Sequence, residues 1–140
     1  MRSFWIGFVA GLFVAFISSW GYQRVKYEWE RAKEDARMLT CSSNLEGVYR
    51  VLLKWSGKRQ SRLPLSLDEA KSEFQAYPDP DARGRCPKAR GEFPPNEGWR
   101  SYLYIPPRED APDDTPILLC WRHPELIAVT KNGSLKRWHK

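Results

Sequence analysis

SFWIGFVAGLFVAFISSW, at residues 3–20, is an uncharged and strongly apolar segment near the amino terminus. Its only polar side chains belong to three serines. As an α-helix, these eighteen residues would span roughly 27 Å, which is enough to cross the hydrocarbon core of a bilayer. Trp5 and Trp20 stand near the two ends, where aromatic rings favour the membrane interface. We therefore expect a transmembrane anchor over residues 1–21. A cleaved signal peptide is an alternative, with Ser19-Trp20-Gly21 as the candidate cleavage site, although the bulky Trp20 separates its two small residues.

Helical periodicity continues beyond the anchor, over residues 22–57. Apolar side chains recur there at alternating intervals of three and four residues, which is typical of one face of an amphipathic helix. The first part of this pattern, which we call the helix seam, consists of Tyr22, Val25, Trp29, Ala32, Ala36 and Leu39. The second part consists of Met38, Cys41, Leu45, Val48, Leu52 and Trp55, widened by Tyr49, Val51 and Leu53. We expect the second part to be buried against a sheet, and the helix seam either to protrude or to pack on neighbouring molecules. Gly57 is expected to end the helix with a left-handed cap.

The remaining residues, 58–140, predict a small α+β head. Ser66 and Glu69 have the spacing of a capping box, which predicts a short helix at about residues 67–75. Residues 77–98 are rich in proline, glycine and charge and predict a loop.

Short apolar runs dominate the last third of the chain and predict strands at residues 99–105 and 116–121. Asn132-Gly133 lies between two further such runs, which is a strong signal for a β-hairpin. The predicted fold is therefore α+β: a long N-terminal helix, membrane-spanning and then amphipathic, packed on a small C-terminal antiparallel sheet.

The chain has 140 residues and a net charge of +6, so it holds at most one small folded domain with a basic surface. Such a surface is either simply solvated or binds anionic lipid headgroups or an acidic polymer. The densest basic group, a possible anion-binding site, is Arg83, Arg85, Lys88 and Arg90. The basic and aromatic motifs of nucleic-acid-binding modules are absent from the sequence, so we expect no nucleic-acid partner.

The three cysteines are Cys41, Cys86 and Cys120. They allow one disulfide with three alternative pairings, of which Cys86–Cys120 is our candidate, or three buried thiols. Cys120 and His123 lie three residues apart at a predicted strand end, where strand alternation would point them to opposite faces. We found no CxxC pair and no histidine-spaced cluster, so we predict no metal site.

Sequence motifs of catalysis are also absent. There is no glycine-rich phosphate loop and no nucleophile elbow, and the paired carboxylates lie in predicted loops without an apolar pocket. We therefore expect no enzymatic activity, no cofactor and no small-molecule substrate.

Three stretches resemble bacterial pseudopilins of type II secretion systems and type IV pilins. AKEDARMLTCSSNL, at residues 32–45, resembles the AKxxARxxxCxxNL stretch of one branch. Arg85-Cys86-Pro87 resembles its Cys-Pro loop, and His123 followed by Asn132-Gly133 is similar to its terminal His-x9-Asp-Gly motif. The resemblance implies a pilin-like fold in a single-pass protein of the inner membrane. It also implies a structural role, with membrane lipid and other pseudopilin-like envelope subunits as partners.

The sequence departs from this family at two places. Gly7-Phe8 corresponds to the family's processing site. The fifth residue counted from Phe8 is Leu12. The family has a glutamate at this position, which pairs with the free amino terminus of a neighbouring subunit during assembly. Asn132 stands where the family has aspartate, and the spacing after His123 is one residue shorter. A relative that kept the fold and lost polymerisation is one interpretation.

The orientation in the membrane is predicted differently by two arguments. The family resemblance implies an extracytoplasmic head, which is our expectation. The cluster of Lys and Arg that follows the anchor favours a cytoplasmic head by the positive-inside rule.

Overall fold

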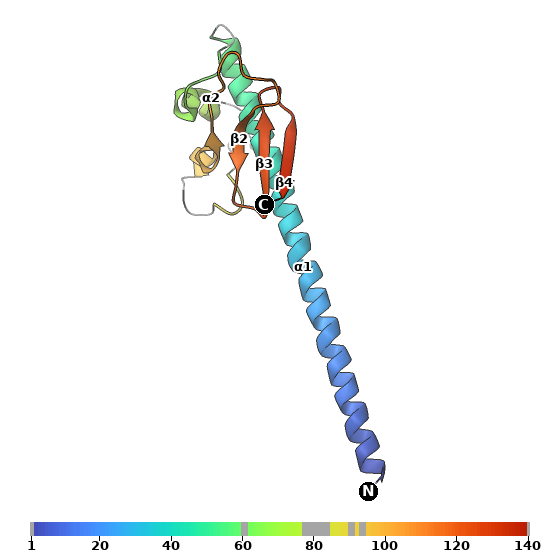
Figure 1. The fold of residues 1–140 in the computed structure, drawn as a ribbon. Coiled ribbons are helices and arrows are strands. Elements are labelled where there is room, and N and C mark those ends of the chain that lie inside the picture. The colour runs from blue at the N-terminus through green and yellow to red at the C-terminus, as the bar shows by residue number, and fades with distance from the viewer. Residues whose placement is uncertain (1, 60–61, 77–84, 90–91, 93–94, 140) are drawn as a thin grey trace. The chain divides into compact units, whose positions relative to one another are not determined.

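The first helix, α1, runs without interruption from Arg2 to Gly57 (Figure 1). This confirms the single long helix expected from the sequence. The structure is a computed structural model, and the residues that it describes are 2–59, 62–76, 85–89, 92 and 95–139, without the side chains of residues 2–15.

The chain divides into two compact units, Met1–Asp35 and Ala36–Lys140. Residues 36–57 of α1 thus belong to the same unit as the predicted head, whereas the head expected from the sequence begins at residue 58. The reason is that these helix residues supply much of the apolar core of the second unit.

The first unit consists of helix alone. Within the described residues, no helical segment combines the length and hydropathy needed to cross a bilayer. The anchor predicted over residues 1–21 falls largely on residues 1–15, whose side chains lie outside the described part of the chain. It therefore stays a prediction from the sequence.

A four-stranded antiparallel sheet forms the C-terminal part of the second unit, with strand order β1-β2-β3-β4. The strands are β1 (Leu103–Tyr104), β2 (Pro116–Cys120), β3 (Glu125–Thr130) and β4 (Leu135–His139). The β3–β4 hairpin turns at Asn132-Gly133, where Gly133 has a φ of 85°. The predicted hairpin and the predicted small antiparallel sheet are both confirmed.

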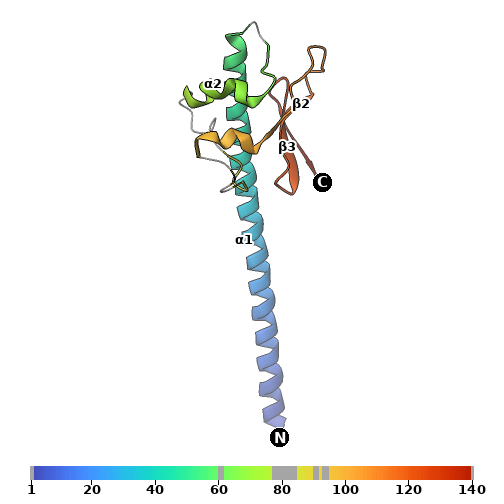
Figure 2. The ribbon, with the colours of Figure 1, turned by 90° about the vertical axis from the view of Figure 1, so that its left-hand side faces the viewer.

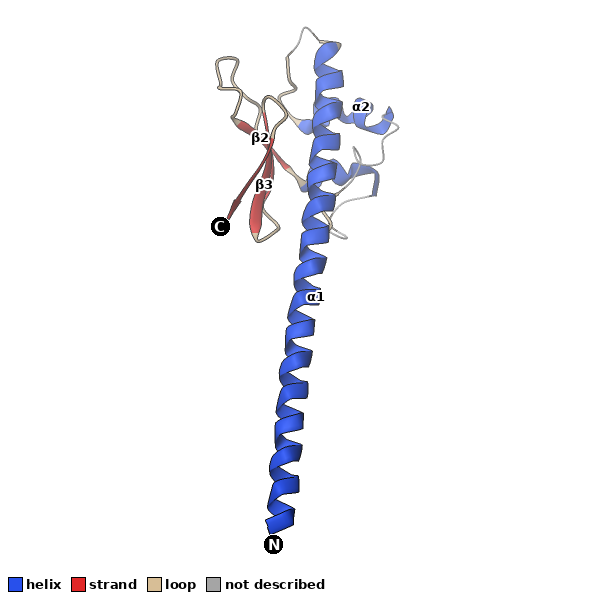
Figure 3. Cartoon of the chain, turned by 90° about the vertical axis from the view of Figure 1, so that its right-hand side faces the viewer, coloured by secondary structure: helices blue, strands red, loops and turns tan. Residues whose placement is uncertain are grey.

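Residues 38–55 of α1 bury one face in the core that the helix shares with the sheet. The sheet lies beside the C-terminal part of α1 (Figure 3). The buried residues include every member of the second part of the periodic pattern, from Met38 to Trp55. Leu53 is the exception among the flanking apolar residues that we expected to widen this face, because it is about half exposed. Gly57 is the last residue of α1 as predicted, but it does not adopt the left-handed conformation expected of a cap.

Short helical segments pack against α1 on the other side from the sheet (Figures 2 and 3). They are η1 (Leu67–Ala70), α2 (Lys71–Ala76) and η3 (Pro95–Ser101). The Phe74 and Trp99 rings stack here with centroids 4.7 Å apart.

Two local predictions were wrong in this region. The side chain of Ser66 makes no capping hydrogen bond, and the Glu69 carboxylate accepts from the Leu65 backbone N–H instead. The strand expected at residues 99–105 is reduced to two residues, because the stack with Phe74 holds Trp99 in η3.

Candidate functional site

The helix seam is solvent-exposed along its whole length. Its four large members, Tyr22, Val25, Trp29 and Leu39, are 61–71% exposed. Both of its alanines are exposed as well. A shallow, mainly apolar groove of about 550 Å³ lies on this part of α1, within the first unit. It is lined by Gly21, Arg24, Val25, Glu28, Trp29 and Ala32. Isolated exposed hydrophobic residues are common, but a continuous apolar surface of this kind is typical of an interaction site.

Charged side chains border the helix seam. Arg24 and Glu28 line the groove with opposite signs. Lys33 lies 5.4 Å from the centre of the Trp29 ring and forms an ion pair with Glu30 at 3.2 Å. Exposed pairs of this kind contribute little to stability, so their main effect is to make the edges of the seam polar.

The second candidate site is a buried cluster of three thiols and one imidazole, which we call the cysteine–histidine cluster. Cys41 comes from α1, Cys86 from the segment before η3, and Cys120 from the last position of β2. His123 follows in the connection to β3. The three cysteines are fully buried and His123 is almost fully buried. Their sulfur and nitrogen atoms all lie within 4.8 Å of one another.

Cys86 lies at the centre of the contacts in this cluster. Its Sγ is 3.4 Å from Cys120 Sγ and 3.4 Å from His123 Nε2. Backbone N–H groups also donate to two of the sulfurs: that of Lys88 to Cys86, and that of Arg122 to Cys120. In both cases the donor is two residues after the cysteine.

Neighbouring hydrogen bonds fix the segment that carries Cys86. Its backbone N–H donates to Ser101 Oγ at 2.9 Å, and that hydroxyl donates to the Gly98 carbonyl at 2.7 Å. Asn44 Nδ2, one turn of α1 beyond Cys41, donates to the Arg85 carbonyl at 3.0 Å. The cluster is therefore built into the core from three separate parts of the chain.

The thiols of the cluster differ in acidity. Hydrogen bonds from the Cys120 and Cys41 thiols hold the pKa of Cys86 well below its ordinary value. The Cys41 thiol is a donor to Cys120 and Cys86 and is buried, and both effects raise its pKa. Cys86 thus accepts hydrogen bonds from both other thiols.

Sequence reasoning missed this cluster. We expected strand alternation to separate Cys120 from His123, but β2 ends at Cys120 and the bend that follows turns His123 back into the core. That expectation was wrong. The spacing Cys-x-x-His at residues 120–123 was the available signal, whereas Cys41 and Cys86 lie too far away in the sequence to be connected without the fold.

The candidate disulfide between Cys86 and Cys120 stays a prediction. Their sulfurs are neighbours at 3.4 Å, but all three cysteines are free thiols in the structure. A disulfide would require the two sulfurs to approach to about 2.05 Å.

The predicted anion-binding group is described only in part. Arg83 and Arg90 lie outside the described residues, while Arg85 and Lys88 are half-buried beside the cysteine–histidine cluster. The structure therefore does not show these four cations as one exposed patch.

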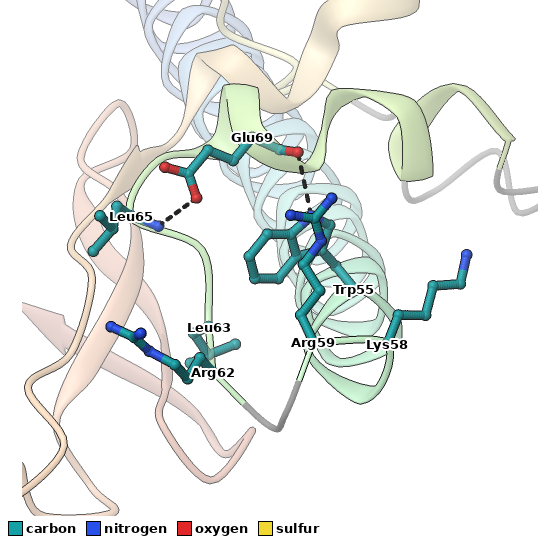
Figure 4. A pocket seen from close by; sticks show the side chains of 7 residues that line it. All are labelled: Trp55, Lys58, Arg59, Arg62, Leu63, Leu65 and Glu69. Carbon is teal, nitrogen blue, oxygen red and sulfur yellow. Dashed lines mark hydrogen bonds between the residues drawn. The ribbon is translucent and has the colours of Figure 1, made fainter.

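A separate basic hollow of about 430 Å³ lies near the end of α1 (Figure 4). It is lined by Trp55, Lys58, Arg59, Arg62, Leu63, Leu65 and Glu69. Arg59 stacks over the Trp55 ring at 5.0 Å, and Lys58 is paired with Glu73. Two of the cations that line the hollow, Arg59 and Lys58, are therefore held by contacts with other side chains of the protein.

Comparison with known proteins identifies no relative: no protein-family profile, curated protein or solved structure matches the chain. Its function must therefore be argued from its own residues.

Proposed function

We propose that this protein is a non-catalytic assembly subunit of a bacterial envelope structure, pseudopilin-like in type. Residues 1–21 would hold it in the inner membrane, and the helix seam would pack against the same seam of a second copy. The exposure of the four large seam residues, at 61–71%, is the observation that carries this proposal.

The chemistry of the seam favours a helix of the same sequence as its occupant. Burying one large apolar side chain is favourable by about 1.5–3 kcal/mol, so a shared apolar interface would stabilise a pair of helices. Gly21 has no neighbouring atom where a Cβ would stand, which leaves room for a second backbone. Arg24 and Glu28 border the groove, and in a pair of copies each charge could meet its opposite.

Trp29→Glu, compared with Tyr27→Glu, tests this proposal. Tyr27 is 66% exposed, close to the 62% of Trp29, but a two-residue offset places it about 160° away around the helix. We expect the full-length chain to self-associate in detergent by sedimentation equilibrium. Trp29→Glu should abolish this association, and Tyr27→Glu should preserve it.

The proposal fails if the unsubstituted chain is monomeric in detergent and gives no crosslinked pairs in native membranes. It also fails if both variants associate as the original chain does. Equal loss in both variants would point to general disruption of the helix and not to the seam.

The location of the head is a separate part of the proposal. We place it on the extracytoplasmic side, as the family resemblance implies. A membrane-impermeant maleimide applied to intact cells should then label Asp110→Cys, an exposed turn position. Labelling only after permeabilisation would place the head in the cytoplasm, as the charges after the anchor favour.

Binding of an anionic lipid or polymer is the rival function. We do not prefer it, because Arg85 and Lys88 are half-buried, and Arg59 and Lys58 of the basic hollow are held by Trp55 and Glu73.

A further inference from the structure

We infer that the cysteine–histidine cluster is a structural metal site that binds one Zn²⁺ ion. Cys41 Sγ, Cys86 Sγ, Cys120 Sγ and His123 Nε2 would be its four ligands. This inference does not depend on the proposed assembly function.

The ligand set matches the preferences of zinc. Three thiolates and one imidazole form one of the common structural zinc sites in proteins, and such sites are closed by four protein ligands. All four side chains are buried here, which agrees with a structural and not a catalytic centre. Calcium and magnesium are excluded as natural occupants, because they prefer oxygen ligands.

The distances are close to those of a tetrahedral site. Zinc–sulfur bonds of about 2.3 Å and zinc–nitrogen bonds of about 2.0–2.1 Å place neighbouring ligand atoms roughly 3.5–3.8 Å apart. Two contacts to Cys86 Sγ measure 3.4 Å, and every pair of ligand atoms lies within 4.8 Å. Small side-chain movements would therefore complete the coordination.

The backbone is arranged to support metal-bound sulfur. The N–H groups of Lys88 and Arg122 donate to Cys86 and Cys120, each from two residues further along the chain. Hydrogen bonds of this kind, from outside the ligand set, orient the ligands and tune the metal.

Metal binding also explains why four donor groups converge. A Cys86–Cys120 disulfide would involve only two of the four donor groups. Zn²⁺ binds all four, and each thiol that is protonated beforehand releases one proton to solvent. The bound site, with three thiolates and one Zn²⁺, carries a net charge of −1.

Cobalt substitution of the reduced, full-length chain tests the inference. We expect one zinc per chain by elemental analysis, and Co²⁺ should give the visible bands of tetrahedral cobalt with thiolate-to-cobalt charge transfer. His123→Asn should weaken Co²⁺ binding by more than about 100-fold, since even partners outside the ligand set typically contribute 10–100-fold. His139→Asn is the matched control, because His139 is 91% exposed, and it should bind as the original chain does.

His123→Cys guards against simple misfolding. It replaces nitrogen with sulfur, so it should retain the metal and strengthen the charge-transfer band. The inference is overturned if the reduced chain binds no zinc or cobalt, if His123→Asn leaves the cobalt spectrum unchanged, or if His123→Cys abolishes binding. A Cys86–Cys120 disulfide in protein isolated from cells without reductant would overturn it as well.

Discussion

Cys86 Sγ lies 3.4 Å from His123 Nε2, although 37 positions separate the two residues in the sequence. The contact joins the segment before η3 to the connection between β2 and β3, and Cys41 adds α1 to the same cluster. A metal ion bound there would link these three parts of the second unit.

Removal of the metal should therefore destabilise the second unit. An ion present at about 1,000 times its dissociation constant stabilises the folded state by about 4 kcal/mol. We expect a zinc chelator to lower the Tm by roughly 15 °C or more, measured by circular dichroism. The same chelator should have no effect on Cys41→Ser. Elemental analysis should confirm that the chelator has removed the zinc. If the Tm is then unchanged, the metal does not stabilise the second unit.

The hairpin turn should not tolerate a side chain at Gly133. Its φ of 85° is unfavourable for other residues, and an added Cβ would lie 2.6 Å from Tyr49 Cε1. Tyr49 cannot easily move, because its hydroxyl donates to the Lys131 carbonyl at 2.7 Å. We expect Gly133→Ala to lower the free energy of unfolding by about 2–4 kcal/mol in urea denaturation.

Gly57→Ala is the matched control for this substitution. Gly57 has ordinary helical geometry and no atom within 4 Å of an added Cβ. It should leave stability unchanged or raise it by up to about 1 kcal/mol. Equal effects of the two substitutions would mean that the turn geometry at Gly133 is not as described.

The stack between Phe74 and Trp99 should be a main support of the short helices. Phe74 is fully buried, and its ring is nearly parallel to that of Trp99, at 7°. Phe74→Ala should therefore cost about 3–5 kcal/mol of unfolding free energy. Leu65→Ala, at an exposed position in the same region, should change stability by less than about 0.5 kcal/mol. Thermal unfolding that does not distinguish the two variants would contradict the observed packing.

Self-association through the helix seam should depend little on salt. An apolar interface is not screened by ions, whereas attraction between exposed charges weakens as the Debye length falls to about 3 Å at 1 M salt. We expect the dissociation constant of the full-length chain in detergent to change less than about threefold between 0.1 and 1 M NaCl. A much weaker association at high salt would mean that pairs of opposite charges, such as Arg24 and Glu28, hold the copies together and that the apolar seam does not.

The repeating patterns in the sequence predicted the architecture well. The interval of three and four residues located α1 and its buried face, and Asn132-Gly133 located the β3–β4 hairpin. Both signals are local, since each depends on residues within a few positions of one another. The helix seam was also recognised from the sequence, because its apolar residues repeat at the same interval of three and four.

Long-range contacts could not be predicted in the same way. Trp99 was predicted in a strand, but it lies in η3, where its ring stacks on Phe74. The predicted capping box does not form, and the Glu69 carboxylate accepts a hydrogen bond from the Leu65 backbone N–H instead. The cysteine–histidine cluster depends on Cys41 and Cys86 meeting the end of β2, which only the folded chain shows.

Zinc K-edge X-ray absorption of the full-length chain, purified with reduced thiols, tests the inferred metal site most directly. We predict a four-coordinate zinc with three sulfur neighbours at about 2.3 Å and one imidazole nitrogen at about 2.0–2.1 Å. His123→Cys should convert this shell to four sulfurs. A shell of oxygen and nitrogen alone, or a protein that retains no zinc, would contradict a metal site at Cys41, Cys86, Cys120 and His123.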